Sequence, residues 1–335
     1  MSRSIRPALP GHVSRLSRIL LLSCATLLAC GGAAVAQDNY PNRAIRIVVP
    51  YTPGGNADLV SRLYAKELTD VLGQAVQVEN RPGGATNIGA EAVARSAPDG
   101  YTLFLLQGTS HGINPSLYAK LSYDPLKDFS AVGLLANTTF YLVVNPTLPV
   151  NNVRELVAYA RANPNKLSFA SPGNASPTHL AGEMLNRRAE MGVQHVPYKG
   201  DAPAIVDLIA NRVLFLFSAT ALNFVKQGKL KALAVADTKR WPLEPGIPSM
   251  AEAGFPNFEI LSYFGLGVPA LTPAAIQDKL NAAIVEIGKR EDTRKRLTDM
   301  GLVPLGGNRE EANAYVAREI EKWRPIVAGV GAKPD

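Results

Sequence analysis

Tyr51-Thr-Pro-Gly-Gly-Asn-Ala-Asp58 is the segment of this sequence that decides the fold. It follows the β-type run at 44–50 and precedes a stretch in which Val60, Tyr64 and Leu68 share one helical face. Glycines at such a junction let a ligand approach the first backbone N–H groups of the helix, which have no partner inside it. With the helix dipole, they predict an anion site that needs no cationic side chain. The alternative, that Pro-Gly-Gly is only a tight turn, stays open.

The same design returns one strand later. Residues 76–80 form a β-type run, and Arg81-Pro-Gly-Gly-Ala-Thr-Asn87 leads into another helical pattern. The repetition indicates a shared architecture more than a second site. We interpret the second segment as a turn or as the rim of a cleft, and the first as half of an anion site.

Strand-like runs alternate with helical patterns along nearly the whole chain, which is typical of an α/β fold. The runs at 134–145 and 260–268 are long, and each lies between two blocks of strand–helix units. A chain that crosses to a second domain and returns needs two such crossings. We therefore expect two lobes with a two-strand hinge and a ligand cleft between them. Lobe 1 comprises 37–138 and 262–335, and lobe 2 comprises 139–261.

Residues 1–36 have the pattern of a secretory signal peptide. Arginines precede the apolar run 19–29, and Ala34-Val-Ala36 is a small-residue cleavage site. Cys24 and Cys30 both lie in this leader, so the mature chain is expected to contain no cysteine. A competing interpretation takes Cys30 as the lipidated first residue of a lipoprotein. No later apolar run reaches the roughly 18 residues of a membrane span, so a soluble exported protein is expected.

Charge and motifs argue against several function classes. The formal net charge is +7, and four arginines of the leader account for more than half of it, which leaves +3. No basic block with interleaved aromatic residues follows, so nucleic-acid binding is not predicted. Neither a Walker loop nor a G-x-G-x-x-G fingerprint occurs, and the three later histidines show no metal-ligand spacing. The sequence thus predicts no cofactor and no metal.

Gly108-Thr-Ser-His-Gly112 matches the nucleophile elbow of serine hydrolases. An Asn-Pro pair interrupts the helix that the elbow needs, and only His179 and His195 follow as candidate triad partners. These two departures make an exported hydrolase that uses Ser110 the alternative function and not the preferred one. No catalytic residue is assigned. The preferred interpretation places Ser110 and His111 on a polar loop facing the cleft.

Several other polar loops follow strands, where α/β sheets bind ligands. Two of them carry Thr178 and Tyr198, which we include as ligand-binding candidates. Asp58 is interpreted as an acid in the first turn of a helix, where the dipole favours it. Asp201 is interpreted as a helix N-cap, with a contact to a ligand amine as the open alternative.

Motifs across the mature chain resemble the Bug family, the substrate-binding receptors of tripartite tricarboxylate transporters. In family order they are Tyr40-Pro-Asn-Arg-Ala-Ile45, Pro53-Gly-Gly with Asp58 and Arg62, Asn80-Arg-Pro-Gly-Gly84, Pro98-Asp-Gly-Tyr-Thr-Leu103, Asn114-Pro-Ser-Leu-Tyr118, Tyr123-Asp-Pro with Lys127-Asp-Phe129, Val196-Pro-Tyr-Lys-Gly200 and Gly228-Lys-Leu-Lys-Ala-Leu-Ala-Val235. Each motif alone is unspecific, whereas the set in order is highly specific.

The resemblance implies a periplasmic, type II binding-protein fold that holds a small carboxylate between its lobes. Main-chain N–H groups of two loops are the implied ligand contacts. Carried onto this chain, they are Gly54, Gly55, Asn56 and Ala57 in one loop and Ser171, Gly173, Asn174 and Ala175 in the other, with Tyr51 as an aromatic lining residue. Asp201 and the Asn56-Ala57 pair depart from the family pattern. The first departure puts the identity of the ligand in doubt.

We therefore expect a receptor and not an enzyme. Its partners would be a small organic anion and a membrane transporter or a sensor, and the protein is expected to act as a monomer. The sequence does not distinguish dicarboxylates, tricarboxylates, amino acids and aromatic acids as ligands.

Overall fold

The computed structural model describes residues 39–332, and the residues from Arg43 onward form one compact unit. The signal peptide predicted for residues 1–36, with Cys24 and Cys30, lies outside the described residues. Within 39–332, no helix combines the length and the apolar character needed to cross a lipid bilayer.

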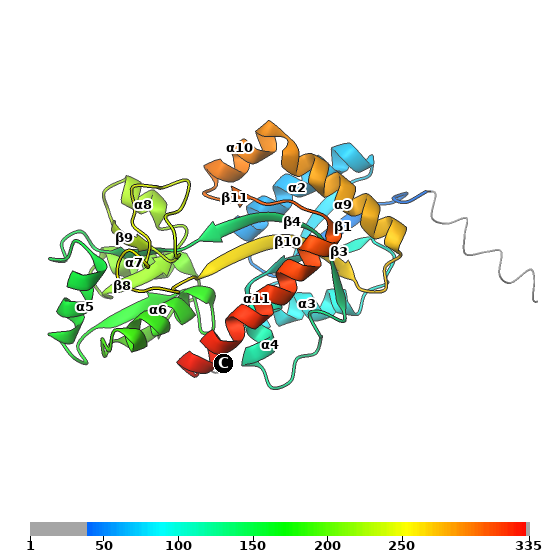
Figure 1. Cartoon of the computed structure of the whole chain (residues 1–335). Coiled ribbons are helices and arrows are strands. Elements are labelled where there is room, and N and C mark those ends of the chain that lie inside the picture. The colour runs from blue at the N-terminus through cyan, green and yellow to red at the C-terminus, as the bar shows by residue number, and fades with distance from the viewer. Residues whose placement is uncertain (1–38, 333–335) are drawn as a thin grey trace, which may run out of the picture. The chain divides into compact units, whose positions relative to one another are not determined.

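Strands and helices alternate along this unit (Figure 1). The strands are β1 (Ile45–Val49), β2 (Val76–Asn80), β3 (Thr102–Gln107), β4 (Phe129–Thr139), β5 (Tyr141–Val144), β6 (Ser168–Ser171), β7 (Gln194–Pro197), β8 (Phe215–Ser218), β9 (Lys231–Val235), β10 (Leu261–Pro269) and β11 (Val303–Pro304). The helices are α2 (Asn56–Leu72), η1 (Gly84–Thr86), α3 (Asn87–Ala94), η2 (Thr109–Ile113), α4 (Asn114–Leu117), α5 (Val153–Arg161), α6 (Pro177–Arg188), α7 (Asp201–Ile209), α8 (Leu222–Lys226), α9 (Ala274–Lys289), α10 (Glu291–Asp299) and α11 (Arg309–Val330).

The strands form two sheets, which gives a mixed α/β fold. The first sheet has six strands in the order β11-β4-β10-β3-β1-β2. Its β1 pairs in parallel with β2 and β3, so the loops after β1 and β3 leave the same edge. Strand β10 runs antiparallel to β3 and β4. All six residues of β3 are buried, as expected for a central strand covered on both faces.

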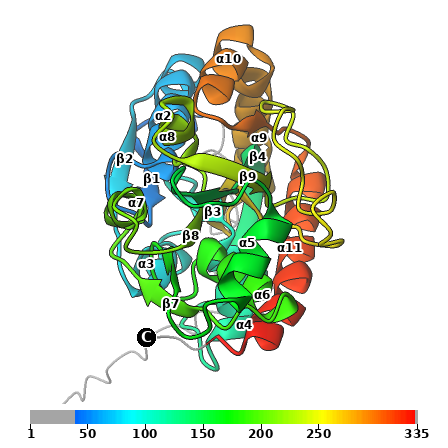
Figure 2. The same cartoon turned by 90° about the vertical axis from the view of Figure 1, so that its left-hand side faces the viewer.

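The second sheet has five strands in the order β7-β6-β8-β5-β9, with β6 parallel to β7 and β8. Alternate residues of β8 pack on opposite faces, as the two-residue period of a strand requires. Phe215 and Phe217 pack with residues of α6, whereas Leu216 packs with residues of α7. The two helices therefore cover opposite faces of this sheet, and Figure 2 shows them apart.

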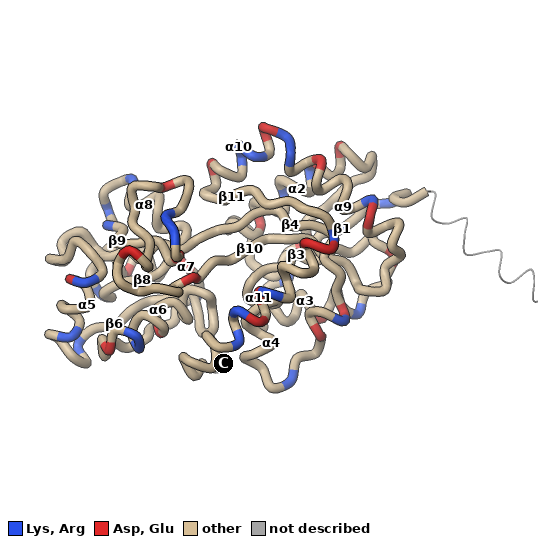
Figure 3. The backbone as a smooth tube through the Cα atoms, viewed as in Figure 1, with Lys and Arg blue, Asp and Glu red and all other residues tan. Residues whose placement is uncertain are grey.

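The chain changes sheets where the sequence predicts its long strands. The expected single strand at 134–145 is two strands, because β4 ends at Thr139 in the first sheet and β5 begins at Tyr141 in the second. Strand β10 returns the chain to the first sheet after β9. Neither β4 nor β10 contains a charged residue, and both appear uncoloured by charge in Figure 3.

Helix boundaries follow local signals. The predicted face of α2 is buried, with Val60, Tyr64 and Leu68 all 0 % exposed, and the helix ends at Gly73 in the left-handed conformation. Asn308 caps α11 in a capping box with Glu311. Helix α3 buries Ala90 and Val93, whereas Ile88 is 55 % exposed.

Candidate functional site

The loop from β1 to α2 is held in shape by one buried carboxylate. Asp58 is 3 % exposed, and its Oδ2 accepts hydrogen bonds from Gly54 N–H at 3.0 Å and from Arg62 Nε at 2.9 Å. Its Oδ1 accepts from Asn80 Nδ2 at 3.0 Å, and that amide also donates to the Tyr51 carbonyl. Burial raises the pKa of the Asp58 carboxyl, but the bonds from Arg62, Asn80 and Gly54 outweigh it and hold the pKa below its ordinary value. Asp58 therefore clamps the loop.

This clamp changes the predicted role of Gly54. Its N–H, expected to meet a ligand, donates to Asp58 instead. Gly55 occupies the N-cap of α2 and has no side chain to cap the helix, so the first N–H groups, beginning at Asn56, lack a partner inside the helix. Both glycines are exposed, and a Cβ added to either would meet nothing within 4 Å. The helix start is thus open to a ligand.

Tyr51 stands beside this open helix start. Its hydroxyl donates to Thr109 Oγ1 at 3.3 Å, which links the loop after β1 with the residues that follow β3. Burial of the hydroxyl raises the pKa of Tyr51 to about 12. The phenol is therefore neutral, and its hydroxyl holds the loop after β1 against Thr109.

The loop from β6 to α6 is braced by its own side chains. Ser171 Oγ donates to the Gly173 carbonyl at 2.9 Å and accepts from the Gly173 N–H at 3.2 Å. Ser176 caps α6 by accepting the His179 N–H, and Pro177 is the first helical residue. The Ala175 N–H donates to His179 Nδ1. The N–H groups of Gly173 and Ala175 are therefore engaged within the loop, and Thr178 lies buried in the first turn of α6.

The loop after β7 lies beside this segment. The Tyr198 N–H donates to the Ser171 carbonyl at 2.9 Å, and Gly200 donates to Pro172. The Tyr198 hydroxyl, however, donates to Asp207 Oδ2 at 2.7 Å on α7. The backbone of Tyr198 thus belongs to the loop cluster, while its hydroxyl is engaged elsewhere.

Asp201 is not the predicted N-cap. Gly200 takes that position, and Asp201 is the first residue of α7. Its Oδ2 accepts from the hydroxyls of Ser218 and Thr220, at 3.2 and 3.1 Å, and its Oδ1 is buried without a hydrogen-bond partner. Burial raises the pKa of this carboxyl above its ordinary value of 3.8, against the two hydroxyl bonds that lower it.

Ser110 and His111 do not face a cleft. Both are 0 % exposed, Ser110 Oγ lies 2.8 Å from His111 Nδ1, and Gln107 Nε2 donates to Ser110 Oγ. His111 Nε2 is buried without a hydrogen-bond partner, and burial lowers the pKa of His111 to about 3. Trp323 covers this segment, since a Cβ on the neighbouring Gly112 would lie 2.6 Å from its ring. The expectation of an open polar loop is corrected accordingly.

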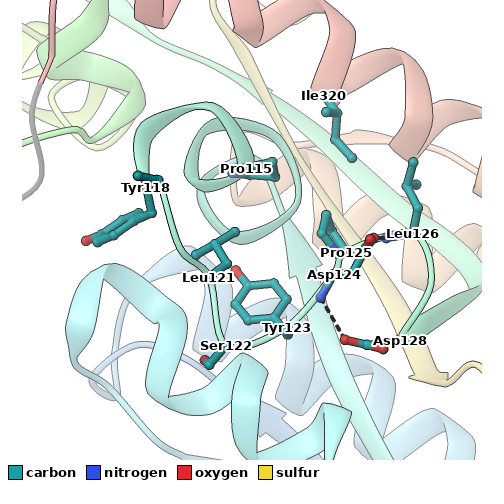
Figure 4. A pocket seen from close by; sticks show the side chains of 11 residues that line it. Pro115, Tyr118, Leu121, Ser122, Tyr123, Asp124, Pro125, Leu126, Asp128 and Ile320 are labelled. Atoms are coloured by element: carbon teal, nitrogen blue, oxygen red, sulfur yellow. Dashed lines mark hydrogen bonds between the residues drawn. The ribbon is translucent and has the colours of Figure 1, made fainter.

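Two cavities lie away from the predicted residues. One, of about 580 Å³, is lined by residues between Pro115 and Asp128 and by Ile320 of α11 (Figure 4). There the Asp124 N–H donates to Asp128 Oδ2, which fixes the turn before β4. The other, of about 530 Å³, lies between α6 and α11. Neither is lined by a residue of the predicted ligand set.

The structure thus groups the predicted residues by sheet. Tyr51, Gly54, Gly55, Asn56 and Ala57 follow the first sheet, and Ser171, Gly173, Asn174, Ala175, Thr178, Tyr198 and Asp201 follow the second. Within 39–332, no group of three or more His, Cys, Asp or Glu side chains is placed to hold a metal ion.

The sequence did not reveal the side chains that hold the loops after β1 and β6 by hydrogen bonds. Asp58 was interpreted only as a dipole partner, and Asn80 was not singled out for the role that it has. The available signal was an Asn at the end of the strand next to the loop. The supporting role of His179 could be suspected only from its position three residues after the cap Ser176.

The comparisons with known proteins agree on one family. The family model "Tripartite tricarboxylate transporter family receptor" matches residues 60–332. Protein BugT of Bordetella pertussis is 33% identical over 325 residues, which cover 96% of this chain and 99% of BugT. A structure of R. palustris Rpa4515 with adipate has a TM-score of 0.82 at 33% identity and covers 88% of this chain and 100% of that one. MatC from Rhodopseudomonas palustris with bound malate has a TM-score of 0.76 at 33% identity and covers 86% and 100%.

Proposed function

Because the chain belongs to the tripartite tricarboxylate transporter receptor family, we propose that it captures a small organic carboxylate between its two sheets and delivers it to a membrane transporter or a sensor. The adipate and malate in two similar structures support a carboxylate as the ligand. The protein acts in the periplasm after its leader is removed. The hydrolase alternative through Ser110 receives no support from the comparisons.

One observation carries the proposal. The start of α2 and the loop before α6 both follow parallel strands, and neither 51–58 nor 171–179 contains a lysine or an arginine. Backbone N–H groups at a helix start bind a carboxylate without such a side chain. The ligand then touches Tyr51, Gly55, Asn56 and Ala57 on one side and the loop from Ser171 to Thr178 on the other. Gly54, Gly173 and Ala175 shape these loops through their own hydrogen bonds.

The lobes that close on the ligand are 37–138 with 262–335, and 139–261. This division is supported by the exchange of sheets between Thr139 and Tyr141 and between β9 and β10. Binding contacts from both sides would favour the closed arrangement, because a ligand raises the population of the state to which it binds more tightly.

A thermal-shift screen tests the proposal. Mono-, di- and tricarboxylates, amino acids and aromatic acids are added to the mature chain, with adipate and malate included. A ligand at a hundred times its dissociation constant raises the free energy of unfolding by about 2.7 kcal/mol. At least one carboxylate should therefore raise the melting temperature clearly. A complete absence of such shifts contradicts the proposal.

One substitution tests the proposed contact at α2. Asn56 is the first residue of the helix, where proline is tolerated because its missing N–H has no partner within the helix. Asn56→Pro should weaken carboxylate binding about tenfold by removing one donor to a charged group, with little loss of stability. Glu291→Pro, at the corresponding position of α10, is the matched control and should bind normally. Equal binding by both variants and the wild type would remove α2 from the site.

A further inference from the structure

A stack of aromatic rings lies beneath the loop between β6 and α6. The imidazoles of His179 and His195 are stacked with centroids 3.8 Å apart, and the Phe169 ring, tilted by 30° to His195, lies 4.9 Å from it. Phe215 continues the stack at 5.2 Å from Phe169. The rings come from α6, β7, β6 and β8, so the stack joins the four elements around the loop.

Both imidazoles of the stack contact the loop. His179 Nδ1 accepts the Ala175 N–H at 2.9 Å, and His195 Nε2 lies 2.7 Å from Ser171 Oγ. The Ser171 hydroxyl lies within hydrogen-bond distance of both the Gly173 carbonyl and His195 Nε2, so His195 holds Ser171 in place, as donor or as acceptor according to its tautomer. His179 Nδ1 carries no proton, because it accepts. Neutral His179 is therefore the Nε2–H tautomer.

The electrostatic surroundings of His195 agree with a neutral ring. Burial, together with the neighbouring His179, lowers the pKa of His195 to about 4. His179 itself is only 9 % exposed.

The loop that these hydrogen bonds hold contains backbone conformations that are energetically unfavourable. Ala175 has φ +56°, a left-handed conformation that an L-residue with a Cβ rarely adopts. Gly173, at φ +149°, also requires a conformation that favours glycine. The energy of one hydrogen bond and the cost of a left-handed alanine are of similar size, so loss of the bond should shift the loop to other conformations.

We propose that His179 is the positioning residue of the ligand loop: its Nδ1 holds Ala175 in the left-handed conformation and so directs the loop for carboxylate capture, without touching the ligand itself. This proposal rests on the proposed function. His195 supports it by holding Ser171 and by stacking on His179. Ala175 contributes to this positioning, because its left-handed backbone makes the loop conformation depend on the hydrogen bond to His179 Nδ1.

A spectroscopic measurement tests the bond directly. In the ligand-free protein with ¹⁵N labels, a scalar coupling across the N–H···N hydrogen bond should connect the Ala175 amide nitrogen with His179 Nδ1. The same spectra should show slow amide exchange at Ala175. If the coupling is absent and this amide exchanges as fast as exposed loop amides, the proposal is overturned without reference to any ligand.

Three variants then separate positioning from packing. In His179→Asn, the side-chain oxygen replaces Nδ1 as acceptor, whereas His179→Leu has no acceptor. The double variant His179→Leu/Ala175→Gly places a glycine where a left-handed conformation costs little. Adipate and malate are the probes, with calorimetric affinity and melting temperature measured for each protein.

We expect His179→Leu to bind the carboxylate about tenfold more weakly, because a smaller fraction of the protein molecules has the loop in the conformation that binds the ligand. His179→Asn should stay within roughly threefold of the wild type, and the added glycine should recover at least about threefold. A pure packing role predicts equal losses in His179→Leu and His179→Asn and no recovery by glycine, which would overturn the proposal. If the wild type binds neither probe, the proposed function fails for these acids, while the coupling and the Ala175 exchange rate in His179→Leu still decide the role of His179.

Discussion

Two buried carboxyl groups near the proposed ligand loops differ in how their charge is balanced. Asp58 receives hydrogen bonds from three donors, one of them the guanidinium of Arg62. Asp201 receives two hydroxyl bonds on one oxygen, and its other oxygen has no partner. The pKa of Asp58 is accordingly held below 3.8, and that of Asp201 is raised above it. The same residue type thus has a well-compensated charge at Asp58 and a poorly compensated one at Asp201.

Substitution of these carboxyls by amides should change stability in opposite directions. At pH 7, Asp58→Asn should lower the free energy of unfolding by about 2 kcal/mol, because an amide cannot accept all three bonds. Asp201→Asn should raise it by about 1 kcal/mol, because a neutral group escapes the cost of a buried charge. Urea unfolding of both variants and the wild type measures these differences.

The pH dependence supplies the control for that pair. A lowered pKa contributes stability above the unfolded pKa that is lost as the pH falls through the folded one, so the deficit of Asp58→Asn should shrink in acid. A raised pKa contributes stability present below about pH 3.8 that is lost as the pH rises through the folded pKa. The advantage of Asp201→Asn should therefore grow between pH 4 and pH 7. If the stability advantage of Asp201→Asn over the wild type is larger at pH 4 than at pH 7, burial does not destabilise the Asp201 carboxylate and the assignment is contradicted.

Residues of the site could be predicted from sequence only where the local chain determines their surroundings. Gly55 and Asn56 lie at an open helix start because glycine and a strand–helix junction are both visible in the sequence. Ser110 and His111 are buried because Trp323, more than 200 residues later, packs on their segment. No sequence pattern near Ser110 indicates that a side chain so distant in the sequence buries this segment.

At the scale of elements, the two proposed ligand loops end in differently built helix starts. Helix α2 has a glycine at its N-cap and no side-chain cap, whereas α6 is capped by Ser176. The Ser176 hydroxyl also donates to the Gly173 carbonyl at 2.8 Å. This cap therefore joins the stability of α6 to the shape of the ligand loop.

Removal of that cap should affect both properties. Ser176→Ala should cost about 1 kcal/mol of stability, the usual value for a lost cap, and should weaken carboxylate binding several-fold. Asn308→Ala removes the cap of α11, far along the chain from the loop, and should cost a similar stability with unchanged binding. Chemical unfolding and calorimetric titration with adipate and malate measure the two effects. If both variants lose affinity alike, the link between this cap and the ligand loop is refuted.

The elements themselves follow from short-range patterns more reliably than their partners do. The caps at Ser176 and Asn308 were predictable because a cap involves only three or four consecutive residues. The single strand expected at 134–145 is divided, because the apolar run continues while the partner strands change at Phe140. An apolar run indicates that its residues are buried. Because the residues stay buried where the chain passes from the first sheet to the second, the run does not show where one strand ends and the next begins.

At the scale of the whole unit, α11 connects the two packing regions. Ala312 and Val316, near its start, pack with residues of β3, β4 and β10. Trp323, Val327 and Val330 pack with residues of α6 and β8. The two-crossing pattern of the strands was visible in the sequence, whereas a helix that spans both regions was not. Any closure of the two sheets must accommodate this helix as well as the crossings at Thr139–Tyr141 and after β9.

Ligand binding should bring the two sheets closer, and spin labels can measure the change. Without residues 1–36 the chain contains no cysteine, so introduced cysteines are unique. Ile88 on α3 of the first sheet and Val206 on α7 of the second are 55 % and 60 % exposed, and both accept labels as cysteine variants. The Ile88→Cys/Val206→Cys distance, measured by pulsed electron resonance, should shorten when a carboxylate identified by the thermal-shift screen is added, because contacts from both loops favour the closed state. Ile88→Cys/Leu271→Cys labels two positions on the first-sheet side and should show one unchanged distance. An unchanged distance in the pair that spans the sheets would show that this receptor binds its ligand without closure, and a change in the control pair would assign the movement to the first-sheet side itself.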